Sequence, residues 1–501
     1  MARYKEIDYK QSLMIPVVYS EQLIEGTFEY TLAYLFDHGY INTSIFDKRY
    51  NNDRTGCKAF PPDVLLKIIL FAYSKGVYSS RRIEQLCIEN IVFKALSGNT
   101  CPDHSTISEF VSSMGEDIQN IFVDVLTVCN EMDLIGGEIF ALDGHKVSSN
   151  ASKEWSGKIS DLDNKQNKFK KVTELLVKKH KETDSKEEKE NYKERIIKYK
   201  AKINKITEFI KENKPKEGKR IKEKQSNITD NESARIKSSH GVIQGYTGEA
   251  MTDEKNQIII YAEAFGDSHE QEYVDDMVIG TEKIMKAIRG QNNYLSGKKL
   301  LADNGNFSEK NLEYLAKKKI DAYIPDNEFR KRDPRFKTAK RHAEKKKGED
   351  KSYYRADKFQ YNKSKDIFTC PAGNILKKRA NEIKIKGRYL GKKFKAKDSD
   401  CKDCKLRNKC LKNKNAKSKV LLILRDIPHQ KNYSELMKAK IDTEEGRDIY
   451  SKRMGIVEPV FANIRFHKRL NYFTLRTKKK VNIQWNLFAL VHNIDKIRKF
   501  I

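Results

Sequence analysis

Two aspartates, Asp143 and Asp303, each follow a short apolar run and could share a divalent metal ion. Residues 139–142 are all apolar, and residues 299–302 repeat the pattern of an apolar run followed by Asp and then Gly. Both runs predict short buried strands, and open sheets carry their chemistry beyond the carboxyl ends of their strands. An Asp that merely caps the next turn is the alternative for either residue alone. The recurrence of the pattern favours a metal site.

Two carboxylates need a third to hold a pair of magnesium ions about 3.5–4 Å apart, an arrangement that serves the attacking and leaving oxygens of a phosphodiester. Glu458 is the candidate, on a late helical segment. The basic residues Arg453, Arg465 and Lys468 lie near it in sequence and suit a site that must grip phosphates. An ordinary surface glutamate is the alternative reading of Glu458.

Four cysteines form a second candidate metal site. Cys370, Cys401, Cys404 and Cys410 include one Cys-x-x-Cys step and lie in a basic segment, residues 326–440. Such a set predicts a tetrahedral zinc site that ties together a small insertion lacking its own core. The spacing around Cys370 and Cys410 differs from that of a standard zinc ribbon, and reduced, packed thiols explain the four residues equally well.

The composition indicates a protein of several domains with a polyanionic partner. The chain has 501 residues, of which 38% are hydrophobic and 34% charged, and the net charge is 99 − 70 = +29. Such a basic balance favours nucleic acid over an anionic membrane. Eight cysteines in a chain of this size do not indicate a disulfide framework.

Several other classes of protein are disfavoured. No apolar signal-peptide core follows Met1, and Lys67 interrupts the longest apolar run, residues 64–73. We therefore expect a cytoplasmic protein without a membrane partner. The sequence contains no phosphate-binding loop ending in Gly-Lys-Ser/Thr and no His-Glu-x-x-His helix, which argues against an ATP-driven motor and a zinc protease.

The order of the predicted elements divides the chain into five parts. Residues 1–135 are predicted to form a helical DNA-binding domain, in which a turn and a Ser/Thr cap at residues 101–107 could begin the second helix of a helix-turn-helix. Packing between helices explains these residues equally well. Residues 157–225 predict a hairpin of two antiparallel helices and a basic linker, either a simple spacer or a contact for DNA or a second subunit.

The remaining parts predict a catalytic core. Residues 136–156 and 226–325 read as strand, β-hairpin, helix, strand, helix, strand, which is the order of a ribonuclease H-like sheet. Residues 441–501 are predicted to be helices that complete this core, after the insertion at residues 326–440. The fold class is therefore mixed: an all-α amino-terminal domain plus an α/β ribonuclease H-like core with a mixed sheet, interrupted by a helical hairpin and a Cys-containing insertion.

Several motifs in the same order resemble those of the DDE transposases of bacterial insertion sequences, in the IS-four-like group. The three around the carboxylates are residues 142–146, 302–305 and 450–461. The others are residues 61–67, 97–99, 102–107, 229–230 with Arg235, 244–246 and 485–487. The resemblance spans nearly the whole chain.

This resemblance implies that Asp143, Asp303 and Glu458 hold two magnesium ions, which manganese could replace. The ions would activate water, and then a DNA 3′-hydroxyl, for strand cleavage and strand transfer. The implied partners are double-stranded DNA, as transposon terminal inverted repeats and target, and a second copy of the chain. The implied location is the bacterial cytoplasm, on the nucleoid when DNA is bound.

In the group that the chain resembles, a Tyr-Arg-Glu-Lys signature surrounds the glutamate and is associated with handling the cleaved DNA end, and this sequence departs from it. Tyr450 and Arg453 are correctly spaced, but four residues instead of three separate Arg453 from Glu458, and Arg465 stands where lysine is expected. Lys468 is a further basic residue for the end. His145 and Asn306 also depart from the family pattern. A catalytically inactive, transposase-derived DNA-binding protein and a structure-selective nuclease are the alternatives.

Overall fold

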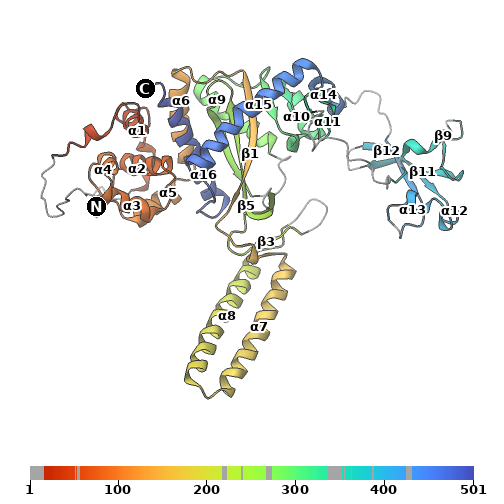
Figure 1. The fold of residues 1–501 in the computed structure, drawn as a ribbon, viewed down its shortest axis with the longest axis horizontal. Coiled ribbons are helices and arrows are strands. Elements are labelled where there is room, and N and C mark those ends of the chain that lie inside the picture. The colour runs from red at the N-terminus through yellow and green to blue at the C-terminus, as the bar shows by residue number, and fades with distance from the viewer. Residues whose placement is uncertain are drawn as a thin grey trace, which may run out of the picture. The chain divides into compact units, whose positions relative to one another are not determined.

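The structure is a computed structural model that divides into two compact units. The first unit is Met1–Asn327 with Ser434–Ile501, and the second is Glu328–Tyr433 (Figure 1). The structure describes residues 16–50, 52, 57–216, 223–238, 241–266, 273–336, 353–354, 356–362, 364–385, 389–413, 415–424 and 432–501.

Helices make up the amino-terminal part of the first unit, as predicted. They are α1 (Phe28–Asp37), α2 (Pro62–Ser74), α3 (Ser80–Glu89), α4 (Ile91–Ser97), α5 (His104–Ser113) and α6 (Asp117–Glu131). Apart from Lys67, every residue of α2 from Leu65 to Tyr73 is buried, because α1, α4 and α16 pack around this helix. Asp103 caps α5 by accepting hydrogen bonds from the N–H groups of Ser105 and Thr106. The buried face of α5 contacts α2, α3 and α16.

A mixed sheet forms the centre of the first unit. Its strands are β1 (Ile139–Ser148), β4 (Ala234–Ser238), β5 (Gly241–Asp253), β6 (Ile259–Phe265), β7 (Lys299–Ala302) and β8 (Asp321–Tyr323). Their order is β4-β5-β1-β7-β8, and β6 pairs with β5. Strand β1 is antiparallel to β5 and parallel to β7, and β7 is parallel to β8. The β5–β6 pair is the predicted hairpin, and β7 and β8 are the other predicted strands.

Strand β1 is longer than predicted, because its two neighbours end at different places. The sequence predicts that the strand ends at Asp143, and the parallel pairing with β7 does end at Leu142 and Ala302. The antiparallel pairing with β5 continues as far as Ser148 and Gly245. Asp143 therefore lies within β1 but at the first position that β7 no longer covers.

Helices pack around this sheet: α9 (Val274–Arg289), α10 (Glu309–Lys317), α14 (Tyr433–Ile441), α15 (Glu444–Ala462) and α16 (Lys478–Ile497). Helix α15 contacts β1, β7 and β8. The shared core contains Ile139, Ala141, Leu301, Tyr323, Ile456 and Val457. Since side chains alternate along a strand, Asp143 points to the same face of the sheet as Ile139 and Ala141.

Helix α16, one of the helices predicted for residues 441–501, is buried almost all round. It contacts β6 and also α1, α2, α5 and α6. Its amides bond to the backbone of β6: Asn482 donates to the carbonyl of Ala264 (3.0 Å) and accepts from its N–H (2.7 Å). Asn493 makes the same pair of bonds with Ile259, both 2.9 Å. Helix α16 thereby satisfies polar groups that an edge strand would leave unpaired.

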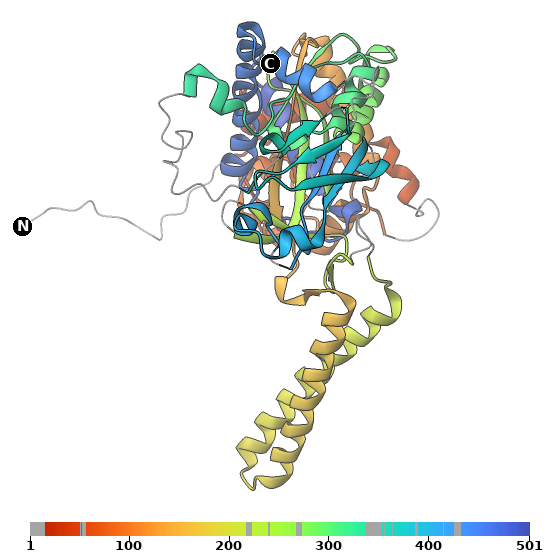
Figure 2. The same cartoon turned by 90° about the vertical axis from the view of Figure 1, so that its right-hand side faces the viewer.

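The predicted helical hairpin is confirmed. Helices α7 (Ile159–Glu182) and α8 (Lys186–Glu212) lie side by side in both views (Figures 1 and 2). Leu162, Ile206 and Phe209 form an apolar cluster between them. Short strands β2 (Ser156–Gly157) and β3 (Ser226–Asn227) pair where the hairpin joins the rest of the unit. Residues 217–222 of the predicted basic linker lie outside the described residues.

The second unit has its own core, which corrects the prediction of a coreless insertion. Its strands are β9 (Gln360–Asn362), β10 (Ile367–Thr369), β11 (Ile375–Ile385), β12 (Tyr389–Ala396) and β13 (Val420–Leu424), and its helices are α11 (Phe329–Arg332), α12 (Asp398–Lys402) and α13 (Arg407–Cys410). The strands form an antiparallel sheet in the order β13-β12-β11-β10-β9. Phe359, Phe368, Leu376, Phe394, Ala396 and Leu421 form the core. Lysines alternate with the core residues, as Lys393 and Lys395 do around Phe394, so the composition of this segment does not reveal its core.

The helical amino-terminal part, which was predicted as a domain of residues 1–135, clusters with the sheet in one unit, because α16 packs against both. Within the described residues, no helix combines the length and apolar character needed to cross a bilayer.

We expect Asn493→Leu to destabilise the first unit by about 3 kcal/mol, because it leaves the N–H and carbonyl of Ile259 buried without partners. Chemical denaturation followed by circular dichroism measures this loss. Asn120→Leu, at an exposed position of α6, is the control and should change the stability little. Equal losses for both variants would contradict the role given to Asn493.

Candidate active site

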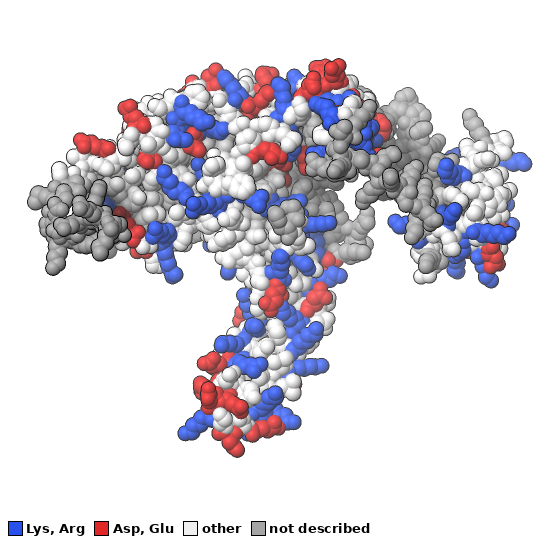
Figure 3. All heavy atoms as spheres, viewed as in Figure 1, with Lys and Arg blue, Asp and Glu red and all other residues white. Residues whose placement is uncertain are grey.

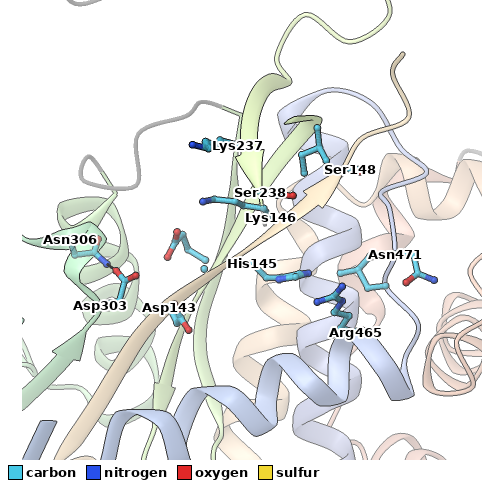
Figure 4. A pocket seen from close by; sticks show the side chains of 14 residues that line it. Asp143, His145, Lys146, Ser148, Lys237, Ser238, Asp303, Asn306, Arg465 and Asn471 are labelled. Carbon is cyan, nitrogen blue, oxygen red and sulfur yellow. Dashed lines mark hydrogen bonds between the residues drawn. The ribbon is translucent and has the colours of Figure 1, made fainter. Parts of the chain in front are cut away.

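Asp143 and Asp303 lie at neighbouring positions of adjacent parallel strands. Leu142 pairs with Ala302 in the last step of the β1–β7 ladder, and each aspartate is the next residue along its strand. The sequence predicted this meeting of two residues that are 303 − 143 = 160 positions apart. Figure 4 shows the Asp303 side chain beyond the end of β7, near the Asp143 side chain on β1.

The Asp143 carboxylate is mostly buried and is paired with a cation. Its Oδ1 atom lies 2.8 Å from Nη2 of Arg453 on α15, and the two side chains are 26% and 11% exposed. Burial raises the pKa of Asp143 to about 6, against the lowering effect of Arg453; the charges of Asp303 and Glu458 raise it further. The three carboxylates are therefore near enough to interact electrostatically.

Asp303 also caps a turn, as its alternative reading proposed. Its Oδ1 atom accepts a hydrogen bond from the N–H of Gly305 (2.9 Å) and one from the Nδ2 atom of Asn306 (3.2 Å). These bonds hold the carboxylate where the chain turns away from β7. Asn306, which departs from the family pattern, thus orients Asp303.

Glu458 lies on α15 and is exposed. Pro459 has no N–H to donate to the carbonyl of Gly455, and the side chain of Gln257 donates to that carbonyl instead, at 2.9 Å. The β5–β6 turn thereby fixes the helix next to Glu458. Glu458 reaches Asp143 electrostatically but does not line the cleft described below.

The side chains of Asp143, Asp303 and Glu458 are not arranged as the ligands of a metal ion in this structure. In the part of the chain that the structure describes, no group of three or more His, Cys, Asp or Glu side chains is placed to hold a metal ion. Carboxylate oxygens are the donors that magnesium prefers, so the chemistry of the set fits. A metal ion shared by these carboxylates would require Arg453 to release Asp143 and the side chains to rearrange.

A cleft of about 490 Å³ opens beside Asp143 and Asp303 (Figure 4). Its basic lining residues include Lys146, Lys237 and Arg465. The cleft combines acidic groups with surrounding cations, a pairing that suits a phosphate backbone brought to a carboxylate site.

The sequence reasoning missed Glu249, a further carboxylate in the cleft. It is 3% exposed, lies on β5 opposite Gly144, and fills the place that a side chain at Gly144 would take. A Cβ atom at Gly144 would lie 2.1 Å from its Oε1 atom, which explains why glycine follows Asp143. The signal available in sequence was one acidic residue in the otherwise uncharged run of residues 241–251.

His145 and Arg465 lie on the other side of Asp143 from Asp303 (Figure 4). Burial lowers the pKa of His145 to about 4, and the charge of Arg465 lowers it further, so the imidazole is neutral at pH 7. Tyr450 is half-buried on α15, near Arg453 in sequence.

Lys468 was predicted to contact the cleaved DNA end, whereas its side chain is buried in the structure. It is 4% exposed, and its Nζ atom lies 3.0 Å from Oδ2 of Asp495 on α16. In this structure Lys468 therefore makes an internal ion pair and does not face the cleft.

The four cysteines of the second unit line one small pocket. All four are partly buried free thiols. Burial raises the pKa of the Cys410 thiol, Lys419 lowers it, and the charges of Cys401, Cys370 and Cys404 raise it. The four sulfur-bearing side chains are thus near one another.

Two segments of the chain match transposase families. Residues 17–113 match the family described as Transposase domain (DUF772), and residues 369–498 match Transposase DDE domain. No curated protein matches the chain. The two family matches support a DDE-type transposase of insertion sequences, as the sequence motifs predicted. The second match includes Arg453 and Glu458, whereas Asp143 and Asp303 lie outside both.

A double-mutant cycle tests the ion pair between Arg453 and Asp143. We expect Arg453→Gln and Asp143→Asn to show a coupling of about 2 kcal/mol in unfolding free energy at pH 8, where Asp143 is ionised. Because the pKa of Asp143 is raised to about 6, the carboxyl gains a proton below that pH, and the coupling should shrink toward zero at pH 5. A coupling that is equal at both pH values would contradict the pairing.

Proposed function

We propose that the chain is an active insertion-sequence transposase that cleaves DNA at transposon ends and joins them to target DNA. Asp143, Asp303 and Glu458 are the metal-binding carboxylates. The observation that carries this proposal is the placement of two aspartates at neighbouring positions of β1 and β7, with the Glu458 helix packed on the same strands.

The sheet supports a ribonuclease H-like core. The strands follow the order β6-β5-β1-β7-β8, in which β1 is antiparallel to β5 and parallel to β7. In this arrangement the aspartates stand where parallel strands β1 and β7 separate, at the carboxyl end of β7, which is where open sheets carry ligands.

Several charged residues in and beside the cleft have a role in this proposal. Bound magnesium would stabilise the charge that develops on the attacking and leaving oxygens of the phosphodiester. Arg453 neutralises Asp143 before metal and DNA arrive, and on release its planar guanidinium can grip a phosphate. Arg465, Lys146 and Lys237 line the cleft and would hold the DNA backbone there. Neutral His145 does not add positive charge beside Asp143.

The DNA partners are proposed from charge. A net charge of +29 suits a protein that holds two duplexes through salt-sensitive phosphate contacts. Lys and Arg are prominent on the visible surface of the second unit, whereas basic and acidic side chains alternate along the α7–α8 hairpin (Figure 3). The hairpin is thus the weaker candidate for DNA contact. Base recognition is assigned to the amino-terminal helices, and action at two ends implies a homodimer.

The test is cleavage of linear DNA that carries the element's terminal repeats, with and without magnesium. Asp143→Asn and Glu458→Gln should each lower cleavage by at least about a hundredfold. Both should leave DNA binding, measured by fluorescence anisotropy, unchanged. Asp163→Asn on α7 and Glu445→Gln in the first turn of α15 are the matched controls and should cleave normally.

The outcomes separate the proposal from its alternatives. Binding without cleavage by the parent protein would favour an inactive DNA-binding relative. Cleavage without joining would favour a nuclease. Full cleavage by Asp143→Asn would remove Asp143 from the site.

A further inference from the structure

The second unit contains a pocket whose lining brings together four cysteines from separate segments. Cys370 follows β10, Cys401 lies in α12, Cys404 follows α12, and Cys410 ends α13. The pocket measures about 20 Å³, which is room for about one water-sized or ion-sized occupant. Cys370, Cys401 and Cys410 also pack on the core of the unit.

The turn at Cys370 directs a backbone donor at the sulfur. The N–H of Asn374 donates to Sγ of Cys370 at 3.3 Å. The N–H of Cys370 donates to the carbonyl of Asn374, and the N–H of Gly373 donates to the carbonyl of Cys370, both at 2.8 Å. Gly373 adopts a φ of +82°, which favours glycine. A backbone N–H that donates to the sulfur fixes the orientation of the cysteine side chain, as outer hydrogen-bond partners do for metal ligands.

Two cations hold the other cysteine segments and offset negative charge. Arg407 donates to the carbonyls of Cys401 (2.6 Å) and Ala416 (2.7 Å). Lys419 donates to the carbonyl of Cys410 at 3.0 Å and lines the pocket. Four thiolates around a divalent ion carry a net charge of −2, and these two side chains balance it.

We propose that Cys370, Cys401, Cys404 and Cys410 bind one zinc ion, which ties the turn after β10 to the α12–α13 segment. The four thiols lose their protons to solvent and form four zinc–sulfur bonds, so no oxidant is involved. As the side chains stand, they are not yet placed as ligands, and binding requires the thiols to turn into the pocket that they line. The role of the ion is structural, since four protein ligands leave no open position for substrate.

The first test is the metal content of the full-length protein, purified without a metal-affinity step. Elemental analysis should find one zinc per chain. Replacement of zinc by cobalt should give the intense visible and near-ultraviolet bands of a tetrahedral thiolate site. Absence of metal, or iron in place of zinc, would overturn the assignment.

The second test asks which thiols hold the ion. Cys404→Ser should lose the zinc, whereas Cys57→Ser, at an exposed cysteine of the first unit, should keep it. In case Cys404→Ser does not fold, a mercurial reagent can be titrated into the parent protein while a zinc indicator follows the released ion. Release in step with modification of the four thiols supports the site, and zinc that persists after they are modified overturns it.

Discussion

The side-chain amides of α16 close the edge of the central sheet, and much of the first unit depends on that contact. Asn482 and Asn493 each give one N–H and one oxygen to the backbone of β6, as a further strand would. The opposite surface of the same helix packs on α2, α5 and α6. Because the helix is buried on both sides, the amino-terminal helices and the sheet cannot separate without exposing its apolar residues and freeing these polar groups.

The cleft depends on a balance of charge on Asp143. Burial disfavours its ionised form, and Arg453 partly offsets that effect. Helix α15 carries both Arg453 and Glu458, so a shift of this one helix would move the cation that pairs with Asp143 and the nearby glutamate together. On the face of β1 opposite to the Asp143 side chain, Glu249 occupies the space beside Gly144. A larger residue at position 144 would collide with this glutamate.

The local sequence pattern predicted the strands and helices well, but it missed features that depend on contacts between residues distant in sequence. The apolar runs before Asp143 and Asp303 indicated two strands, and residues 157–225 indicated the helical hairpin. The extension of β1 to Ser148 could not be predicted, because it comes from pairing with β5 about a hundred residues away. The burial of Lys468 depends on Asp495 in the same way. Glu249 stands out in the sequence as the one acidic residue of an uncharged run, but its place opposite Gly144 follows from the strand register.

The chain leaves the first unit at Asn327 and returns to it at Ser434, and contacts within the first unit hold both points. Asn327, where the chain departs, accepts a hydrogen bond from Asn304, beside Asp303. On return, Ser434 bonds to Glu309 on α10, and Lys440 pairs with Asp321 at β8. Because contacts within the first unit hold both attachment points, the length of the inserted segment can vary at little cost to the sheet.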